Sequence, residues 1–146
     1  MNEEGQTDIS AKLAELLTRA SWRLRINERK ALAPHGLTFA QARALRTLVD
    51  AGPIRIGDLA AALEIVPRSA TSRVDDLEEA GLVSRSADPD DRRSVIIAVT
   101  SQGQELVNRL RAERRVGAEN LFAPLSGEDK AELLRILSTL TNDRET

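Results

Sequence analysis

The amino-acid sequence predicts a mainly α-helical chain with a single β-hairpin. Hydrophobic residues make up 41% of the 146 residues and aromatic residues only 2%, so the core must consist of aliphatic side chains. Apolar residues recur at helical spacing over most of the chain, as they do at Ala70, Val74 and Leu77. One region departs from this pattern: between Leu82 and Val99, two apolar runs flank the charged segment DPDDRR, which indicates two strands joined by a turn.

Length, charge and cysteine content narrow the class of protein. A chain of 146 residues is expected to form one domain with a core of its own. The absence of cysteine excludes disulfides, thiolate metal ligands and cysteine nucleophiles. No apolar run reaches the roughly 18 residues of a membrane span, and the acidic N-terminus is unlike a signal peptide. We therefore expect a cytoplasmic protein without a membrane partner.

The N-terminal part of the chain predicts two helices. Apolar residues near helical spacing predict a long helix over residues 9–33, which the segment Pro34–Gly36 ends. Thr38 and Gln41 have the spacing of a capping box, in which the two side chains satisfy free backbone N–H groups at a helix start. A second helix is therefore expected to begin there, and residues 54–56 follow it as a short extended segment.

The next two predicted helices are separated by only three residues. The first covers residues 57–63, and residues 64–66 connect it to a helix that begins at Pro67 and ends near Gly81. The apolar positions of this second helix turn one face to the core. Its opposite face carries Arg68, Ser69, Thr71, Ser72, Arg73 and Asp76.

The β-hairpin and two more helices complete the chain. The apolar runs on either side of DPDDRR predict two antiparallel strands. A helix is then expected from Ser101, because Gln104 stands at capping-box spacing from it, to about Phe122. Residues 124–126 begin the last helix, which has an apolar side of leucine and isoleucine.

A helix, a three-residue turn, a second helix and a charged hairpin follow one another in the order of a winged helix-turn-helix. Residues 68–106 closely resemble the MarR family of bacterial transcriptional regulators, above all in the segments LEEAGLVSR, DPDDRR and VTSQGQEL. Because the order of the terminal helices also matches, the resemblance covers nearly the whole chain. It implies a single MarR-like domain over residues 1–146, with dimerisation helices at 9–33 and 101–142 and a winged helix-turn-helix DNA-binding module at 38–100.

The resemblance also implies a function. It suggests a homodimeric repressor that binds double-stranded DNA at a pseudo-palindromic operator and is released by a small, often aromatic, effector. The net charge of −2 is not typical of a nucleic-acid-binding protein, so DNA binding must depend on the local placement of arginines. The alternative from another class is a winged helix that serves as a protein–protein interaction module without specific DNA binding.

The helix that begins at Pro67 is the expected recognition helix. Small polar side chains would allow it to enter a major groove about 12 Å wide, where hydroxyls and guanidiniums can bond phosphates or base edges. The alternative is an ordinary amphipathic helix with a solvated polar face. The residues of this helix that we expect to bind DNA are Arg68, Ser69, Thr71, Ser72 and Arg73.

The hairpin turn is the expected wing. Arg92 and Arg93 at its tip could reach a minor groove, whose negative potential attracts guanidinium. Arg93 matches the groove arginine of the family in the resemblance. Asp91 is expected to pair with Arg85 or a neighbouring arginine and so to hold the shape of the loop. A simple solvated loop is the alternative.

Catalysis and metal binding are not expected. Calcium loops need about 6–8 oxygen ligands and a bidentate acid at a set spacing, which Asp88, Asp90 and Asp91 beside two arginines do not supply. One histidine, no cysteine and no Gly-rich phosphate loop leave no catalytic set. The chain is therefore predicted to be no enzyme and to need no cofactor.

Three residues near the first helix-to-helix corner are candidates for an effector pocket. Trp22, His35 and Phe39 could line an apolar site that stacks an aromatic ligand. The simpler interpretation is that the aromatic side chains belong to the core and that His35 is a loop residue.

Overall fold

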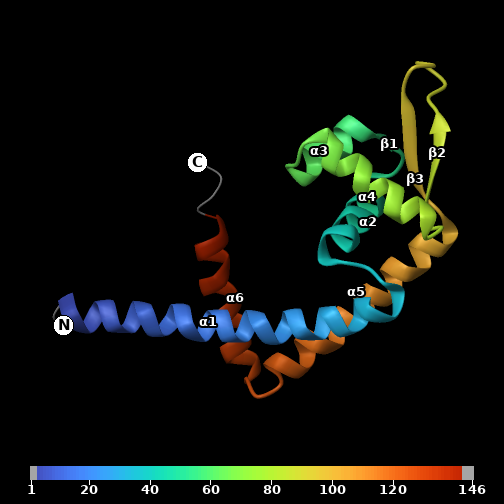
Figure 1. Cartoon of the computed structure of the whole chain (residues 1–146). Coiled ribbons are helices and arrows are strands. Elements are labelled where there is room, and N and C mark those ends of the chain that lie inside the picture. Colours follow the sequence, from blue (N-terminus) through green and yellow to red (C-terminus); the bar gives the residue numbers. More distant parts are fainter. Residues whose placement is uncertain (1–2, 143–146) are drawn as a thin grey trace. The chain divides into compact units, whose positions relative to one another are not determined.

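The computed structural model describes residues 3–142 of the chain. These residues form six α-helices, one short 3-10 helix and three strands (Figure 1). In chain order the elements are α1 (Glu3–Leu32), η1 (Ala33–His35), α2 (Phe39–Ala51), β1 (Ile54–Arg55), α3 (Ile56–Leu63), α4 (Pro67–Glu79), β2 (Val83–Ala87), β3 (Val95–Val99), α5 (Ser101–Phe122) and α6 (Gly127–Asn142). The predicted mainly helical fold with a β-hairpin is confirmed.

The chain divides into two compact units, and the boundaries fall within α1 and α5. The inner unit is Asn27–Glu113, and the terminal unit consists of the described residues on either side of it, 3–26 and 114–142. The winged helix-turn-helix predicted at 38–100 lies within the inner unit. That residues 9–33 and 101–142 serve dimerisation stays a prediction.

Local capping signals set the helix boundaries of the inner unit. The Thr38 hydroxyl accepts from the N–H of Gln41 at 3.2 Å, and the Gln41 amide oxygen accepts from the N–H of Thr38 at 3.0 Å, so the predicted capping box is confirmed. Pro67 is the first residue of α4, as its fixed φ and missing N–H favour. Gly81 follows this helix with a φ of 75°, which glycine adopts without steric cost.

The turn between α3 and α4 contains a strained residue. Glu64 ends α3 in the left-handed conformation, with φ 55° and ψ 42°, and it is the non-glycine residue with positive φ in the described part of the chain. Its conformation lets the N–H of Ile65 reach the carbonyl oxygen of Ala60 at 3.0 Å. The three-residue turn is confirmed at residues 64–66, and the exposed Glu64 occupies a place that favours glycine.

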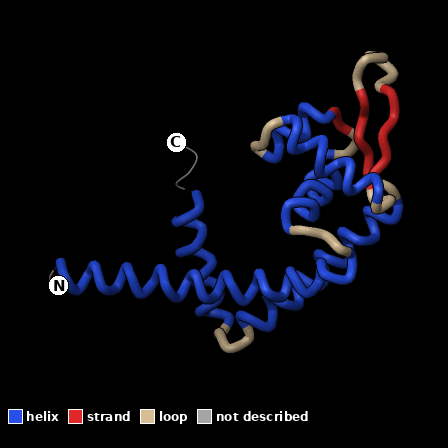
Figure 2. The backbone as a smooth tube through the Cα atoms, viewed as in Figure 1, coloured by secondary structure: helices blue, strands red, loops and turns tan. Residues whose placement is uncertain are grey.

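The strands form one antiparallel sheet in the order β1-β3-β2 (Figure 2). β2 and β3 pair from Val83↔Val99 at one end to Ala87↔Val95 at the other, which confirms the predicted two-stranded wing. The extended segment before α3 adds a third strand, because Arg55 pairs with Ile96. The sheet thereby joins the wing to the residue that immediately precedes α3.

The start of α5 differs from the prediction by one residue. Thr100, not Ser101, is the cap: its hydroxyl accepts from the N–H of Gly103 at 3.1 Å and donates to the carbonyl oxygen of Gly81 at 2.7 Å. The N–H of Thr100 is bonded to the carbonyl oxygen of Leu82, which fixes this residue where β3 ends. A side chain at Gly103 would overlap that same carbonyl, so the close approach of α5 requires glycine here.

The hydrophobic core lies in the inner unit. Ala70, Val74 and Leu77 of α4 are fully buried, as predicted from their spacing. The core contains leucine, isoleucine, valine and alanine from α2, α3, α4, the sheet and the inner parts of α1 and α5. Among the described residues of the terminal unit, by contrast, ten large apolar side chains remain exposed. They are Ile9, Leu13, Leu16, Leu17, Trp22, Ile26, Val116, Leu134, Ile136 and Leu140.

Candidate nucleic-acid interface

The outer face of α4 is polar along its first two turns. Arg68, Thr71 and Ser72 are exposed, and Ser69 and Arg73 are half-buried. The Thr71 hydroxyl donates to the carbonyl oxygen of Pro67 at 3.0 Å, which leaves its oxygen free to accept. Three small hydroxyl side chains between two arginines give a narrow polar surface that could approach base edges or phosphates.

The arginines of α4 and the wing differ in their partners. Among the described residues, Arg68, Arg73, Arg92 and Arg93 form no ion pair, whereas Arg85 forms two. The side chains expected to contact DNA therefore keep their full charge, and the remaining arginine is neutralised by carboxylates of the protein itself.

Arg85 joins β2 to α4. Its guanidinium donates to Asp75 at 2.5 Å and to Glu78 at 2.8 Å. The hydrogen bond to Asp75 is the main cause that raises the pKa of Arg85 above its ordinary value. The expected pair of Arg85 with Asp91 is wrong, because Arg85 extends from the strand toward α4 while Asp91 lies in the turn beyond the end of that strand.

Asp91 shapes the wing turn through its own neighbours. One carboxylate oxygen accepts from the N–H of Arg93 at 3.0 Å, and the other accepts from the Ser94 hydroxyl at 2.8 Å. The backbone bond to Arg93, followed by the bond to Ser94, lowers the pKa of Asp91. The carboxylate thus holds the turn next to Arg93 and stays ionised at neutral pH.

Sequence reasoning missed a further pair where the wing turn begins. Asp88 is buried, with 6% of its surface exposed, and its carboxylate accepts from the guanidinium of Arg55. The N–H of Asp90, followed by Arg55, lowers the pKa of Asp88. No local signal could have revealed the pair, because its members are 33 residues apart and come from β1 and from the turn after β2.

Arg92 and Arg93 are exposed at the tip of the wing, as predicted. Arg93 also borders a hollow of ≈ 400 Å³ between the wing and the start of α3. The hollow is lined by Arg55, Ile56, Gly57, Asp58, Arg93, Ser94 and Val95. The wing arginine and the helix-turn-helix therefore border one concave surface of the inner unit.

The acidic residues at the end of α4 are largely occupied. Asp75 and Glu78 hold Arg85, and Asp76 accepts from the Gln41 amide at 3.0 Å. Since pairing with Arg85 reduces the repulsion that Asp75 and Glu78 exert on phosphate, these two acids oppose an approach to nucleic acid less than their formal charge indicates.

The three candidates for an effector pocket lie in different surroundings. Phe39 packs against the core of the inner unit, and the guanidinium of Arg29 lies 5.9 Å from the centroid of its ring. His35 is half-buried in η1, while Trp22 belongs to the terminal unit and is largely exposed. The proposal that these three share a ligand site stays a prediction.

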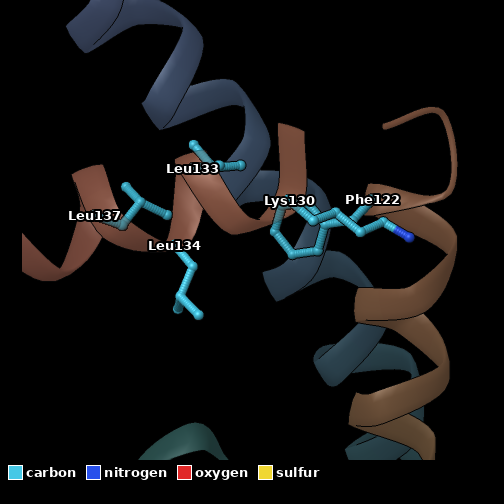
Figure 3. A pocket seen from close by; sticks show the side chains of 5 residues that line it. All are labelled: Phe122, Lys130, Leu133, Leu134 and Leu137. Atoms are coloured by element: carbon cyan, nitrogen blue, oxygen red, sulfur yellow. The ribbon is translucent and has the colours of Figure 1, made fainter. Parts of the chain in front are cut away.

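An apolar hollow is present in the terminal unit instead. It has a volume of ≈ 330 Å³ and is open on one side, and a single lysine provides its charge (Figure 3). Its lining comes from the end of α5 and from α6: Phe122, Lys130, Leu133, Leu134 and Leu137.

Two adjoining helices with a three-residue turn, followed by an arginine-tipped wing, define a winged helix-turn-helix protein. A model described as the MarR family matches residues 37–95. An HTH-type transcriptional repressor of Mycobacterium tuberculosis is 31% identical over 133 residues, which cover 91% of this chain and 96% of the relative. The chain belongs to the MarR family.

Solved structures share the fold. A MarR family protein from Bacillus stearothermophilus has a TM-score of 0.81 at 25% identity and matches 100% of this chain and 99% of its own. A variant of MarR from E. coli, solved in complex with operator DNA, has a TM-score of 0.69 at 22% identity, with 89% of this chain and 94% of the other covered.

Membership of the family answers the question of catalysis. MarR family proteins are transcriptional regulators and not enzymes, so the expectation that the chain is no enzyme is confirmed. Within residues 3–142, no group of three or more histidine or acidic side chains is placed to hold a metal ion. Over the same residues, no helix has the length and apolarity that crossing a membrane requires.

Proposed function

We propose that the protein is a homodimeric transcriptional repressor that binds a pseudo-palindromic DNA operator. The observation that carries the proposal is the set of unpaired arginines on α4 and the wing, Arg68, Arg73, Arg92 and Arg93. Nearby, Arg55 is paired with Asp88, and Arg85 is paired with Asp75 and Glu78. A basic surface confined to one helix and one wing suits a duplex better than an acidic protein partner.

The proposed mode of binding follows from the fold. α4 would lie in the major groove with its hydroxyl face toward the bases, and Arg93 would enter the adjacent minor groove. Two copies related by a two-fold axis would read half-sites about 34 Å apart. The relatives support this proposal, since one is a repressor and another was solved with operator DNA. A regulator of this kind acts on the chromosome, so the proposed location is the cytoplasm.

The exposed apolar side chains of the terminal unit support self-association. Leucine and isoleucine on α1 and α6 lie exposed in the single chain, and an apolar surface of this extent is typical of an interface. A second copy of the same helices would bury it. A small aromatic effector that releases the operator is the finer part of the proposal, with Trp22, His35 and Phe39 as the residues to test.

The proposal is tested by titrating labelled DNA from the neighbouring intergenic region at several salt concentrations. Arg93→Ala should weaken operator binding by about 1–3 kcal/mol without unfolding the protein. Arg111→Ala is the matched control, because this exposed arginine is already paired with Asp50. Adding a phenolic acid to the titration tests effector release.

The outcome decides between DNA binding and the alternative function. Affinity that depends on sequence and falls steeply with salt supports the repressor. The negative net charge favours the protein–protein module, and equal micromolar binding to all DNA sequences, unaffected by Arg93→Ala, would establish that alternative.

A further inference from the structure

The wing turn begins with a buried carboxylate whose role goes beyond the proposed contacts to DNA. Asp88 immediately follows β2, and within the described residues it is the charged side chain that is buried. Asp90 is exposed and Asp91 is half-buried in the same turn. Because a carboxylate is costly to bury without partners, the bonds that Asp88 makes must hold it in this place.

Both carboxylate oxygens and the backbone N–H of Asp88 form hydrogen bonds. One carboxylate oxygen accepts from both Nε and Nη2 of Arg55, with an Nε distance of 2.8 Å. The other oxygen accepts from the N–H of Asp90 at 3.0 Å. The backbone N–H of Asp88 donates to the carbonyl oxygen of Ser94 at 3.0 Å, across the mouth of the turn. The residue therefore closes the wing turn and ties it to Arg55.

Arg55 connects this turn to the helix-turn-helix. It is the last residue of β1 and the residue that precedes the first turn of α3. β1 has only two residues, so its backbone pairing with β3 is short. A pair of strands is marginally stable alone, so the ion pair with Asp88 is the side-chain link that fixes the wing turn against α3.

We propose that Arg55 is a positioning residue for Arg93. By holding Asp88, it fixes the turn that carries Arg93 relative to α3 and α4, and so sets which minor-groove shape the wing accepts. Narrow, A·T-rich minor grooves attract an inserted guanidinium most strongly. The preference of the protein for A·T-rich base pairs beside the operator half-site therefore depends on how rigidly the wing holds Arg93. This inference rests on the proposed function, because it concerns the fit of the wing to DNA.

The test is a double-mutant cycle with Arg55→Met and Arg93→Ala on two versions of the operator, with A·T-rich or G·C-rich flanks. Arg55→Met should weaken binding to the A·T-flanked operator about tenfold, within the range that one base-directed arginine contributes, and should reduce the preference between flanks. In the Arg93→Ala background, Arg55→Met should have no further effect, because the group that it positions is gone.

Two further variants separate positioning from other roles. Arg111→Met is the matched control, since Arg111 also pairs with an aspartate and its side chain is 44% exposed against 47% for Arg55; it should leave affinity and flank preference unchanged. Arg55→Lys keeps the charge but loses the two-pronged bond to Asp88, so it should recover part of the affinity. The salt dependence should be the same in Arg55→Met and the parent, because a direct phosphate contact, and not a positioning role, would change it.

A measurement without DNA makes the inference independent of the operator. Amide exchange in Arg55→Met should accelerate at Asp90, Arg93 and Ser94, while the amides of α4 keep their protection. Additive losses in the cycle, or unchanged exchange in the wing, would overturn the inference. If the parent protein binds no DNA at all, the proposed function fails, and faster exchange in the wing still supports the tie between Arg55 and Asp88.

Discussion

The inner and terminal units differ in where they place their apolar side chains. Every large hydrophobic side chain that is buried in the described residues lies within Asn27–Glu113. In the described parts of the terminal unit, leucines at the same helical spacing remain exposed. Apolar residues at helical spacing therefore form a buried core in the inner unit and an exposed apolar surface in the terminal unit.

The units differ in their ion pairs as well. In the inner unit, ion pairs connect different elements, such as Arg46 on α2 to Glu28 on α1 and Arg55 to Asp88. In the terminal unit, four ion pairs join neighbours on one helix, as Arg135 and Glu132 do. Local pairs stabilise a helix but do not hold a tertiary arrangement. The inner unit therefore has side-chain ties between its elements, and the apolar surface of the terminal unit supports the proposed self-association.

The largest expected effect comes from replacing a leucine by alanine once in each unit, which tests the difference in burial between the units. Leu45→Ala removes a fully buried side chain of α2 and should lower the free energy of unfolding by about 2–5 kcal/mol. Leu134→Ala on α6, where the side chain is 68% exposed, removes little packing within the chain. Its cost should appear only as weaker self-association. Urea unfolding at several protein concentrations, with sedimentation equilibrium, measures both.

Concentration is the control in this experiment. The loss in Leu45→Ala should be the same at high and low protein concentration, whereas the loss in Leu134→Ala should vanish where the chain is monomeric, because association stabilises by mass action. Equal losses in both variants at all concentrations would contradict the comparison.

The inner unit was predictable where its signals are local. Thr38 with Gln41, Pro67 and Gly81 mark helix ends by their own chemistry, and the spacing of Val74 and Leu77 identifies the buried face. These signals act over a few residues, so the sequence contains them directly. The placement of Arg92 and Arg93 at an exposed wing tip followed from the hairpin in the same way.

The contacts between distant elements were not predictable. Arg85 could have paired with several nearby acids, and only the packing of β2 on α4 selects Asp75 and Glu78 over Asp91. Arg55 and Asp88 meet because the extended segment predicted at residues 54–56 joins the sheet, and no pattern in the sequence predicted that pairing. For the terminal unit, periodicity predicted the helices and their apolar sides but not what covers those sides, since spacing along one helix does not identify the surface that packs against it.

A smaller effect concerns the ion pairs of the inner unit. The pKa of Asp88 is lowered in the folded protein, so its contribution to stability is full above its ordinary value of 3.8 and is lost as the pH falls through the folded-state value. Asp88→Asn should therefore be less stable than the parent at pH 7, and the difference should shrink below about pH 4. Thermal unfolding between pH 7 and pH 3 measures this.

The terminal unit provides the matched control for the pH series. Arg135, one turn away on the same helix, lowers the pKa of Glu132. Because both side chains are largely exposed, Glu132→Gln should change the pH dependence less than Asp88→Asn does. A difference between Asp88→Asn and the parent that stays constant down to pH 3 would show that ionisation of Asp88 is not its cause.

The smallest expected effect is a substitution that should stabilise the inner unit, whereas the earlier ones destabilise it. Glu64 holds a left-handed conformation in the turn before α4, without a hydrogen bond from its side chain to any described residue. Glycine adopts this conformation freely but loses more entropy on folding, so Glu64→Gly should stabilise by about 0.5–1 kcal/mol. Glu64→Ala is the control, since it removes the carboxylate but keeps the Cβ. If alanine stabilises as much as glycine, the gain comes from the lost charge, and the strain in the turn is not what limits the inner unit.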